Sequence, residues 1–128
     1  MSDVFIEGEK AQIVLESVSA WGNVTTIILH GGSVFEFKGP FPKGTLAEGF
    51  YNLRGAGEGA SAGFEGHINL SLVTRIDFQE RQHRGRDSYA LVFNNKDNQP
   101  IFKIFVGRDN QGDLIASQLD AFHALKKL

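Results

Sequence analysis

The feature that most constrains the fold is a pair of β-rich runs separated by two glycines. The first run, Val24 to His30, is rich in β-branched residues, and Gly31-Gly32 follows with the backbone freedom that a tight turn requires. The second run, Ser33 to Lys38, alternates so that Phe35 and Phe37 share one face. The pattern predicts a β-hairpin with one buried face.

The rest of the chain repeats this organisation and adds a helix at each end. Apolar residues recur at helical spacing from Glu9 to Val18 and again from Asp113 to Lys127. Turn signals bound a loop at Gly39–Gly44 and further short strands at Gly49–Arg54, Phe64–Leu70, Arg75–Glu80, Ser88–Phe93 and Gln99–Val106. We therefore expect an α+β fold, in which an antiparallel β-sheet of about seven to nine strands is flanked by N- and C-terminal helices.

Length, charge and residue usage exclude several classes of protein. The 128 residues are expected to form a single domain over residues 1–128, and 41% apolar residues are enough for a core. A formal net charge of −2 argues against a general nucleic-acid binder, and the absence of cysteine excludes disulfides and thiolate metal sites. The N-terminus lacks a signal-peptide pattern, and no apolar run reaches the ~18 residues of a membrane helix. We therefore expect a soluble cytoplasmic protein without membrane insertion.

Familiar catalytic and nucleotide-binding motifs do not occur. The segment from Gly55 to Gly63 is rich in glycine, but it lacks the Lys-Ser/Thr step and the parallel βαβ unit of a phosphate loop, so it predicts a mobile connection. No serine lies in a Gly-x-Ser-x-Gly turn, and no cysteine is present as a nucleophile. The 11 phenylalanines either fill the core or line a pocket for a flat aromatic ligand.

The histidines do not form a metal cluster by their spacing. They are His30, His67, His83 and His123. No two stand two or four residues apart, which argues against a zinc site. His67, inside a predicted strand, is either a partly exposed strand residue or a ligand, and His83, among arginines, is either a solvated hairpin tip or a clamp for carboxylates. Haem iron needs only one or two protein donors, so a lone histidine is sufficient for it.

Three segments resemble one known family. Trp21–Thr26, Gly49–Gly55 and Phe102–Asp109, together with Gly66-His67-Ile68 and Glu80-Arg81, resemble the HutX/HuvX/ChuX-type haem-utilisation proteins. The resemblance implies a fold similar to one half of the HemS/ChuS-type haem proteins. It further implies a cytosolic homodimer that binds haem b, stores it and transfers it in haem iron utilisation, with a haem-degrading enzyme as acceptor. The N-terminal helical extension common in the family has no counterpart in the sequence.

The resemblance also implies iron ligands. His67 matches the family histidine that is linked to haem binding, and we expect it to be the axial ligand. A second family histidine aligns with Leu29, one residue before His30. A one-residue offset in a strand turns the side chain to the opposite face, so His30 becomes a second ligand in that role only if the strand carries a bulge.

Basic residues are expected near the haem propionates. Arg81 is the first candidate, followed by Lys103 and Arg108, with Arg54 as a further cation, because a guanidinium matches a carboxylate in geometry. Arg108 also has a structural explanation, since the adjacent Asp109 is suited to cap the final helix.

Two other functions remain open. The first is a haem-degrading oxygenase, because some HemS-type relatives have that activity. Such an enzyme needs a distal site opposite a defined proximal ligand, and the sequence identifies no such pair, so we expect no enzymatic activity. The second is a non-haem interaction module, in which the histidines are incidental.

Overall fold

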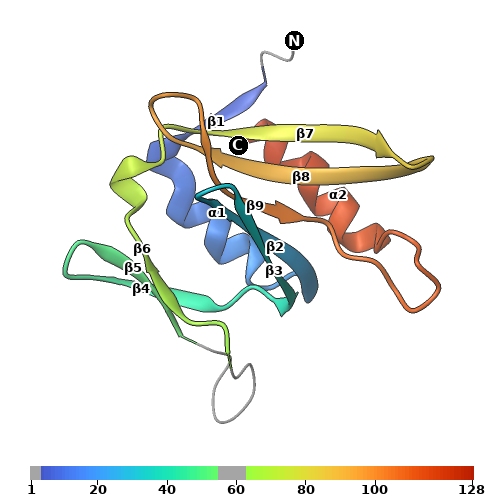
Figure 1. Ribbon diagram of the computed structural model, residues 1–128, viewed down its shortest axis with the longest axis horizontal. Helices are drawn as coiled ribbons and strands as arrows, with labels where there is room; N and C mark the ends of the chain where they lie inside the picture. Colours follow the sequence, from blue (N-terminus) through green and yellow to red (C-terminus); the bar gives the residue numbers. More distant parts are fainter. Residues whose placement is uncertain (1–3, 55–62) are drawn as a thin grey trace.

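The computed structural model describes residues 4–54 and 63–128, so most of the predicted glycine-rich connection, and the side chain of His83, lie outside the described residues. Within these ranges the chain forms two antiparallel sheets, ordered β1-β7-β8-β9-β2-β3 and β4-β5-β6 (Figure 1). The strands are β1 (Phe5–Glu7), β2 (Asn23–His30), β3 (Ser33–Pro40), β4 (Lys43–Ala47), β5 (Phe50–Arg54), β6 (Gly66–Ile68), β7 (Arg75–His83), β8 (Arg86–Asn94) and β9 (Pro100–Phe105). The helices are α1 (Ala11–Val18), α2 (Ala116–Ala124) and the 3-10 turns η1 (Gly8–Lys10), η2 (Leu70–Leu72) and η3 (Leu125–Lys127). The predicted α+β fold is confirmed.

The predicted hairpin is β2–β3, and its register is continuous. Every residue from Asn23 to His30 has a partner on β3, ending with His30 opposite Ser33. Gly31 and Gly32 form the turn with φ angles of 59° and 78°, a conformation that glycine adopts without steric cost. The strand carries no bulge here, which determines the direction of each side chain on β2.

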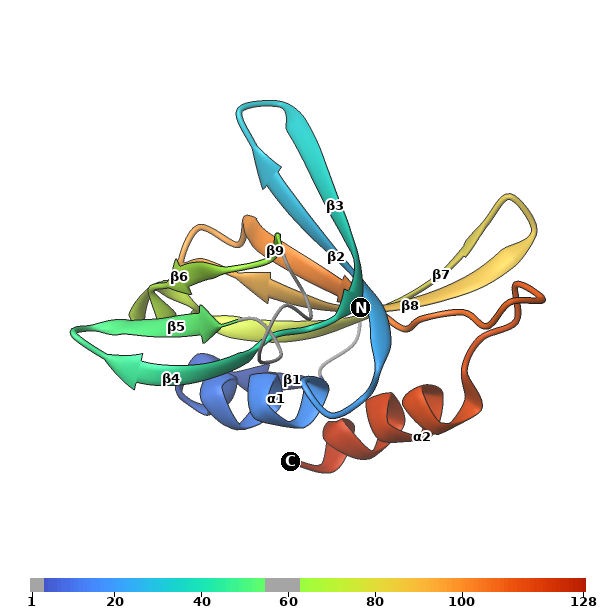
Figure 2. The same ribbon diagram turned by 90° about the horizontal axis from the view of Figure 1, so that it is seen from below.

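Both helices and the smaller sheet pack on one face of the six-stranded sheet. Figure 2 shows α1 and α2 side by side below that sheet, with β4, β5 and β6 next to α1. The buried side chains of β2 on this face are Val24 and Thr26, and the next inward position is Ile28. Because strand residues alternate between faces, Thr25, Ile27 and Leu29 point to the opposite side.

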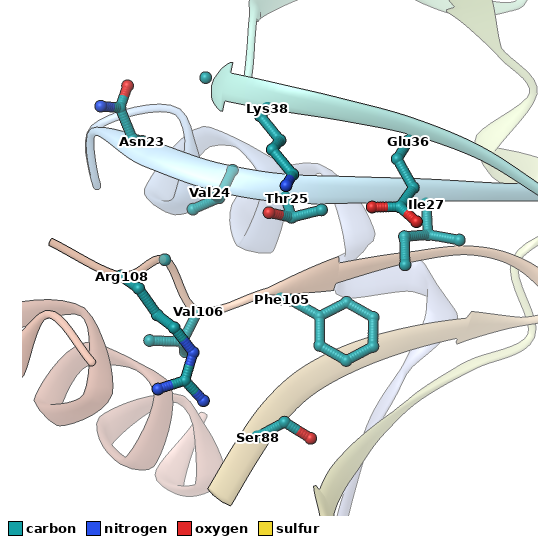
Figure 3. A pocket seen from close by; sticks show the side chains of 12 residues that line it. Asn23, Val24, Thr25, Ile27, Glu36, Lys38, Ser88, Phe105, Val106 and Arg108 are labelled. Atoms are coloured by element: carbon teal, nitrogen blue, oxygen red, sulfur yellow. The ribbon is translucent and has the colours of Figure 1, made fainter. Parts of the chain in front are cut away.

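The opposite face of the six-stranded sheet, called here the outer face, carries no described helix or strand. It contains a hollow of about 700 Å³, lined by residues that include Thr25, Ile27, Phe105 and Arg108 (Figure 3). Within the described ranges, no helix is both long and apolar enough to cross a membrane.

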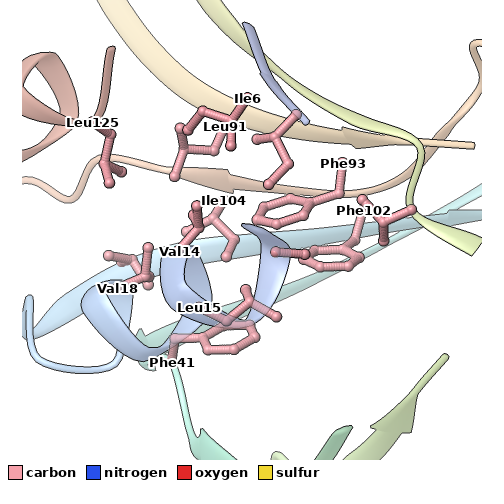
Figure 4. Close-up of a cluster of buried hydrophobic side chains, with 14 of the residues drawn as sticks. Ile6, Val14, Leu15, Val18, Phe41, Leu91, Phe93, Phe102, Ile104 and Leu125 are labelled. Atoms are coloured by element: carbon pink, nitrogen blue, oxygen red, sulfur yellow. The ribbon is translucent and has the colours of Figure 1, made fainter. Parts of the chain in front are cut away.

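The core lies between the helices and the inner face of the large sheet. Val14, Leu15 and Val18 of α1 are fully buried there (Figure 4). Phe93 of β8 and Phe102 of β9 are paired across the two strands, and their rings stack at 4.3 Å. The helical spacing of apolar residues predicted an inward face with Ile13, Val14 and Val18, which is confirmed for the two valines, whereas Ile13 is 54% exposed.

The far half of the hairpin differs from the prediction of one buried face. The side chains of Val34 and Phe35 are 57% and 52% exposed, although they point to opposite faces of β3. Figure 2 shows the hairpin extending beyond the layer of helices, so nothing in the described chain covers either face at its tip. The prediction was wrong because alternation identifies two faces without determining what packs against them.

The predicted loop at Gly39–Gly44 is largely strand. β3 continues to Pro40 and β4 begins at Lys43, so only Phe41 and Pro42 join the two strands. Pro40 is tolerated because β3 is an edge strand, where a missing N–H breaks no hydrogen bond on the free side.

The C-terminal helix begins at Ala116 and not at the predicted Asp113. Asp109 does not cap it, because Ile115 occupies the N-cap position without a side-chain hydrogen bond. The Asp109 carboxylate instead accepts the backbone N–H groups of Gln111 and Asp113 at 2.9 and 3.0 Å. Asp109 therefore stabilises the turn that precedes the helix.

Candidate functional site

An apolar cavity of about 250 Å³ opens where the two sheets meet. It lies between β6, an edge strand of the smaller sheet, and strands β2 and β9 of the larger one. Its apolar lining includes Ile28, Phe41, Leu53, Phe64, Ile68 and Phe102. The Phe64 ring stacks on Phe37 of the hairpin at 4.6 Å and meets Phe41 edge-to-face at 5.7 Å. Several phenylalanines thus line a cavity while others fill the core, and aromatic walls suit a flat apolar ligand.

His67 lies at the rim of this cavity. It is the middle residue of β6, it is exposed, and it pairs with Asn52 on β5. Phe50 of β5, which is 41% exposed, meets the imidazole ring at 6.2 Å in an edge-to-face arrangement. His67 is therefore accessible to a ligand that lies over the smaller sheet.

The Asn52 side chain fixes the orientation of the His67 ring. Oδ1 of Asn52 lies 2.5 Å from Nδ1 of His67. The amide nitrogen Nδ2 of Asn52 donates to the carbonyl oxygens of Thr45, Ala47 and Phe50 at 3.1–3.2 Å. Sequence reasoning did not identify Asn52, because nothing in the sequence gives the register between β5 and β6.

The smaller sheet also presents two cations on its outward surface. Arg54 follows Asn52 by two positions on β5, so both side chains share the face of His67. Lys43 of β4 is the direct partner of Arg54. Like charges at directly opposed strand positions repel each other, so an anion bound between Lys43 and Arg54 would relieve this repulsion. The sequence had indicated Arg54 as a candidate cation for the propionates, whereas Lys43 was predicted to lie in a loop.

The other three predicted cations lie on the outer face. Arg81 pairs with Ser88, and Lys103 pairs with Ile27 and Val92. Figure 3 shows Arg108 in the hollow of that face, on the far side of the sheet from the cavity. A single chain therefore does not bring Arg81, Lys103 and Arg108 to His67.

Two of these cations are also engaged locally. Lys103 Nζ donates to Gln79 Oε1 at 3.0 Å, while burial, followed by the charge of Arg81, lowers the pKa of the Lys103 amine. Arg108 donates to the carbonyl oxygen of Gly112 at 3.0 Å and to that of Asp87. Arg108 thus holds the turn before α2, which is a structural role, although the expected capping of the helix by Asp109 does not occur.

His30 is at the end of β2, exposed, and two positions from Ile28. Because β2 has no bulge, His30 points to the cavity side of the hairpin, and Leu29 points to the outer face. The bulge that would let His30 take the place of the second family histidine is therefore absent. His30 nevertheless shares the face of the hairpin that borders the cavity.

No group of three or more His, Cys, Asp or Glu side chains suited to a metal ion occurs in the described part of the chain. A ligand held here must bring most of its own metal coordination, with the protein adding a single nitrogen donor. The arrangement of His67, the aromatic cavity and the cations of the smaller sheet suits a flat apolar molecule that has an acidic edge and a metal at its centre.

Comparison with known proteins identifies relatives over nearly the whole chain. The model of the family described as haem utilisation ChuX/HutX matches residues 4–125. The chain is 39% identical over 123 residues to the intracellular haem transport protein HutX of Vibrio cholerae, which covers 95% of this chain and 61% of HutX. The chain thus spans less than two thirds of the length of this curated relative.

Solved structures agree in fold. The haem-binding protein ChuX superposes with a TM-score of 0.85 at 35% identity, covering 97% of this chain and 75% of ChuX. A protein of Erwinia carotovora gives 0.86 at 35% identity, over 97% of this chain and 74% of its own. The haem-degrading enzyme ChuS of Escherichia coli O157:H7 gives 0.75 at 16% identity, over 94% of this chain and 34% of ChuS. At that identity the likeness to ChuS concerns the fold alone, and it confirms the predicted half-repeat.

Proposed function

This chain belongs to the ChuX/HutX haem-utilisation family, and on that premise we propose that it binds haem b and works as a haem carrier in the cytoplasm. The observation that carries the proposal is His67 itself, an accessible imidazole at the rim of an aromatic cavity. The carrier stores haem and passes it to an acceptor, for which we propose a haem-degrading enzyme.

The residues around His67 fit the chemistry of haem. Haem supplies an iron with open axial positions, an apolar porphyrin and two carboxylates at one edge. His67 provides the axial nitrogen, and the cavity beyond β6 receives apolar atoms. Arg54 and Lys43, on the other side of His67, bind the propionates. The surface is apolar at β6, beside the cavity, and cationic at β5 and β4. Haem is likewise apolar over most of its disc and anionic at its propionate edge.

An open site suits a carrier better than an enzyme. The cavity of about 250 Å³ is below the ~300–1,000 Å³ of pockets that enclose a ligand, so most of a haem remains outside it. His30 lies on the cavity side of the hairpin, but β2 lacks the bulge that would place it as a second ligand, so the exposed His67 is the ligand in this proposal. A ligand set at the surface allows transfer to an acceptor.

Titration of the purified protein with ferric haem tests the proposal. A saturable shift of the Soret band at one haem per chain is expected, and a titration without such a shift would favour a non-haem interaction module. Adding a physiological reductant under oxygen, with catalase present, separates carrier from oxygenase. The carrier keeps its Soret band, whereas sustained loss of the band with iron release would identify an enzyme.

Replacing Arg54 or Lys43 by glutamine is expected to weaken haem binding about two- to fivefold, because exposed ion pairs contribute modestly. The loss should shrink at high salt, which screens the same charges. Arg81→Gln is the matched comparison on the outer face, where the sequence-based assignment had put the propionates. A larger loss of affinity in Arg81→Gln than in Arg54→Gln would move the propionate site to the outer face.

The outer face supports the proposed homodimer. Ile27 and Phe105 are half-buried on it, and no described element covers them. A second copy packed against this face removes their remaining apolar surface from water. Light scattering at micromolar concentration is expected to give twice the chain mass of 14.1 kDa. The variant Ile27→Glu should shift the mass toward the monomer with an unchanged circular dichroism spectrum, and a wild-type protein of monomer mass would contradict the prediction.

A further inference from the structure

We propose that Asn52 is a positioning residue that fixes the tautomer of His67, so that the ring nitrogen Nε2 carries the free lone pair. The inference deepens the proposed function, since that lone pair is what binds a metal. The tautomer itself is a property of the protein without any ligand, so it is tested independently of haem.

The orientation of the Asn52 amide follows from its surroundings. One end of the amide faces the three carbonyl oxygens of Thr45, Ala47 and Phe50 at 3.1–3.2 Å. Carbonyl oxygens only accept hydrogen bonds, so the group that faces them is the NH₂ group. The reversed orientation would bring Oδ1 against three other oxygens. The amide oxygen must therefore face His67.

The orientation of the amide determines the proton on His67. Asn52 Oδ1 is an acceptor, so the hydrogen bond of 2.5 Å exists only if Nδ1 of His67 carries the proton. A neutral imidazole has a single N–H group, which leaves Nε2 unprotonated. An exposed imidazole without such a partner populates both tautomers, so part of its population cannot bind a metal through Nε2.

This arrangement matches the support that metal-binding histidines receive in proteins. Such a histidine donates its other N–H to a carboxylate or a carbonyl oxygen, which orients the ring and increases its basicity, and loss of the partner costs about 10- to 100-fold in affinity. A neutral amide increases the basicity less than a carboxylate does. A moderately strong axial bond agrees with a carrier that must release its ligand.

The chain offers a control for a merely structural role. Besides facing His67, Asn52 ties the turn between β4 and β5, in which Glu48 and Gly49 have φ angles of 54° and 84°. Gly49→Ala strains that turn, but its added Cβ meets nothing within 4 Å, and Asn52 is kept. Both Asn52→Leu and Gly49→Ala should lower the melting temperature, and only Asn52→Leu should change the state of His67.

The experiment is long-range ¹⁵N–¹H NMR of the ligand-free protein, at a pH where the His67 ring is neutral. Wild type and Gly49→Ala should show a protonated Nδ1 and an unprotonated Nε2, whereas Asn52→Leu should show averaged nitrogen shifts. A protonated Nε2 in the wild type would overturn the proposal, even if haem binds as expected.

The second readout uses the haem-loaded protein. In Asn52→Leu, haem affinity should fall about 10- to 100-fold, and the iron–histidine stretching frequency of the ferrous form should decrease. Gly49→Ala should change neither. Unchanged values in Asn52→Leu would refute the positioning role. If His67→Ala binds haem like the wild type, the ligand assignment fails, while the NMR result for the tautomer stands or falls by itself.

Discussion

Replacing His67 by alanine is expected to weaken ferric haem binding about 100-fold or more, the largest loss among the four single His→Ala variants. Among the histidines with described side chains, His67 combines access, a supporting hydrogen bond to Asn52 Oδ1 and a position beside the aromatic cavity. Its removal takes away the axial nitrogen and leaves only apolar contacts and ion pairs, which do not replace a bond to iron. A titration followed at the Soret band measures the effect.

The matched controls are His30→Ala and His123→Ala. His30 stands at the hairpin tip, and His123 lies on the exposed side of α2, where its ring meets Tyr89 at 5.7 Å. Because His67 is exposed, its replacement should leave the melting temperature nearly unchanged, which separates loss of a ligand from loss of structure. A greater loss of affinity in the His30 or His83 variant would contradict the assignment.

Gly107→Ala is expected to destabilise the fold by about 3 kcal/mol and lower the melting temperature by roughly 10 °C. A Cβ at this position would lie 2.0 Å from the backbone oxygen of Asn23, so the two segments would have to separate. They are held together by Gln118, whose Oε1 accepts the N–H of Gly107 at 2.7 Å. Its Nε2 donates to the carbonyl oxygens of Trp21 and Asn23 at 3.0 and 2.8 Å.

Gly66→Ala is the matched control for this prediction. Gly66 is the first residue of β6, an added Cβ there meets no atom within 4 Å, and its φ is not in the left-handed region. Thermal unfolding followed by circular dichroism should show a small change for Gly66→Ala and a large one for Gly107→Ala. Equal melting temperatures for the two variants would show that the contact between Gly107 and Asn23 is not tight.

These contacts also explain the segments by which the sequence resembled its family. Two of these segments, Trp21–Thr26 and Phe102–Asp109, are far apart in the chain. They meet at Gln118, which bonds to both. Gln118 is buried and satisfies three backbone groups that would otherwise lack partners. The most specific part of the resemblance is therefore a structural joint between β2, β9 and α2, and it does not contact His67.

The positions of the basic residues could not be predicted from the sequence alone. The sequence named Arg54 with Arg81, Lys103 and Arg108 as cations for the propionates, and only Arg54 shares the face of His67. Alternation along a strand relates residues within that strand, but it does not relate strands that belong to different sheets. The division into two sheets, with His67 and Lys103 on different ones, arises from tertiary packing.

By itself, the sequence determined the features that depend on neighbouring residues. Period-two alternation with Gly31-Gly32 gave the β2–β3 hairpin, helical spacing gave α1, and the family resemblance gave the half-repeat fold. Only the tertiary structure decided which faces are covered and which side chains meet. Asn52 and His67 lie on different strands, and their contact depends on the register of β5 against β6, in which the neighbouring residues Tyr51 and Leu53 are buried in the core. Burial free energy is summed over the whole chain, so a contact of this kind is not encoded in any one segment.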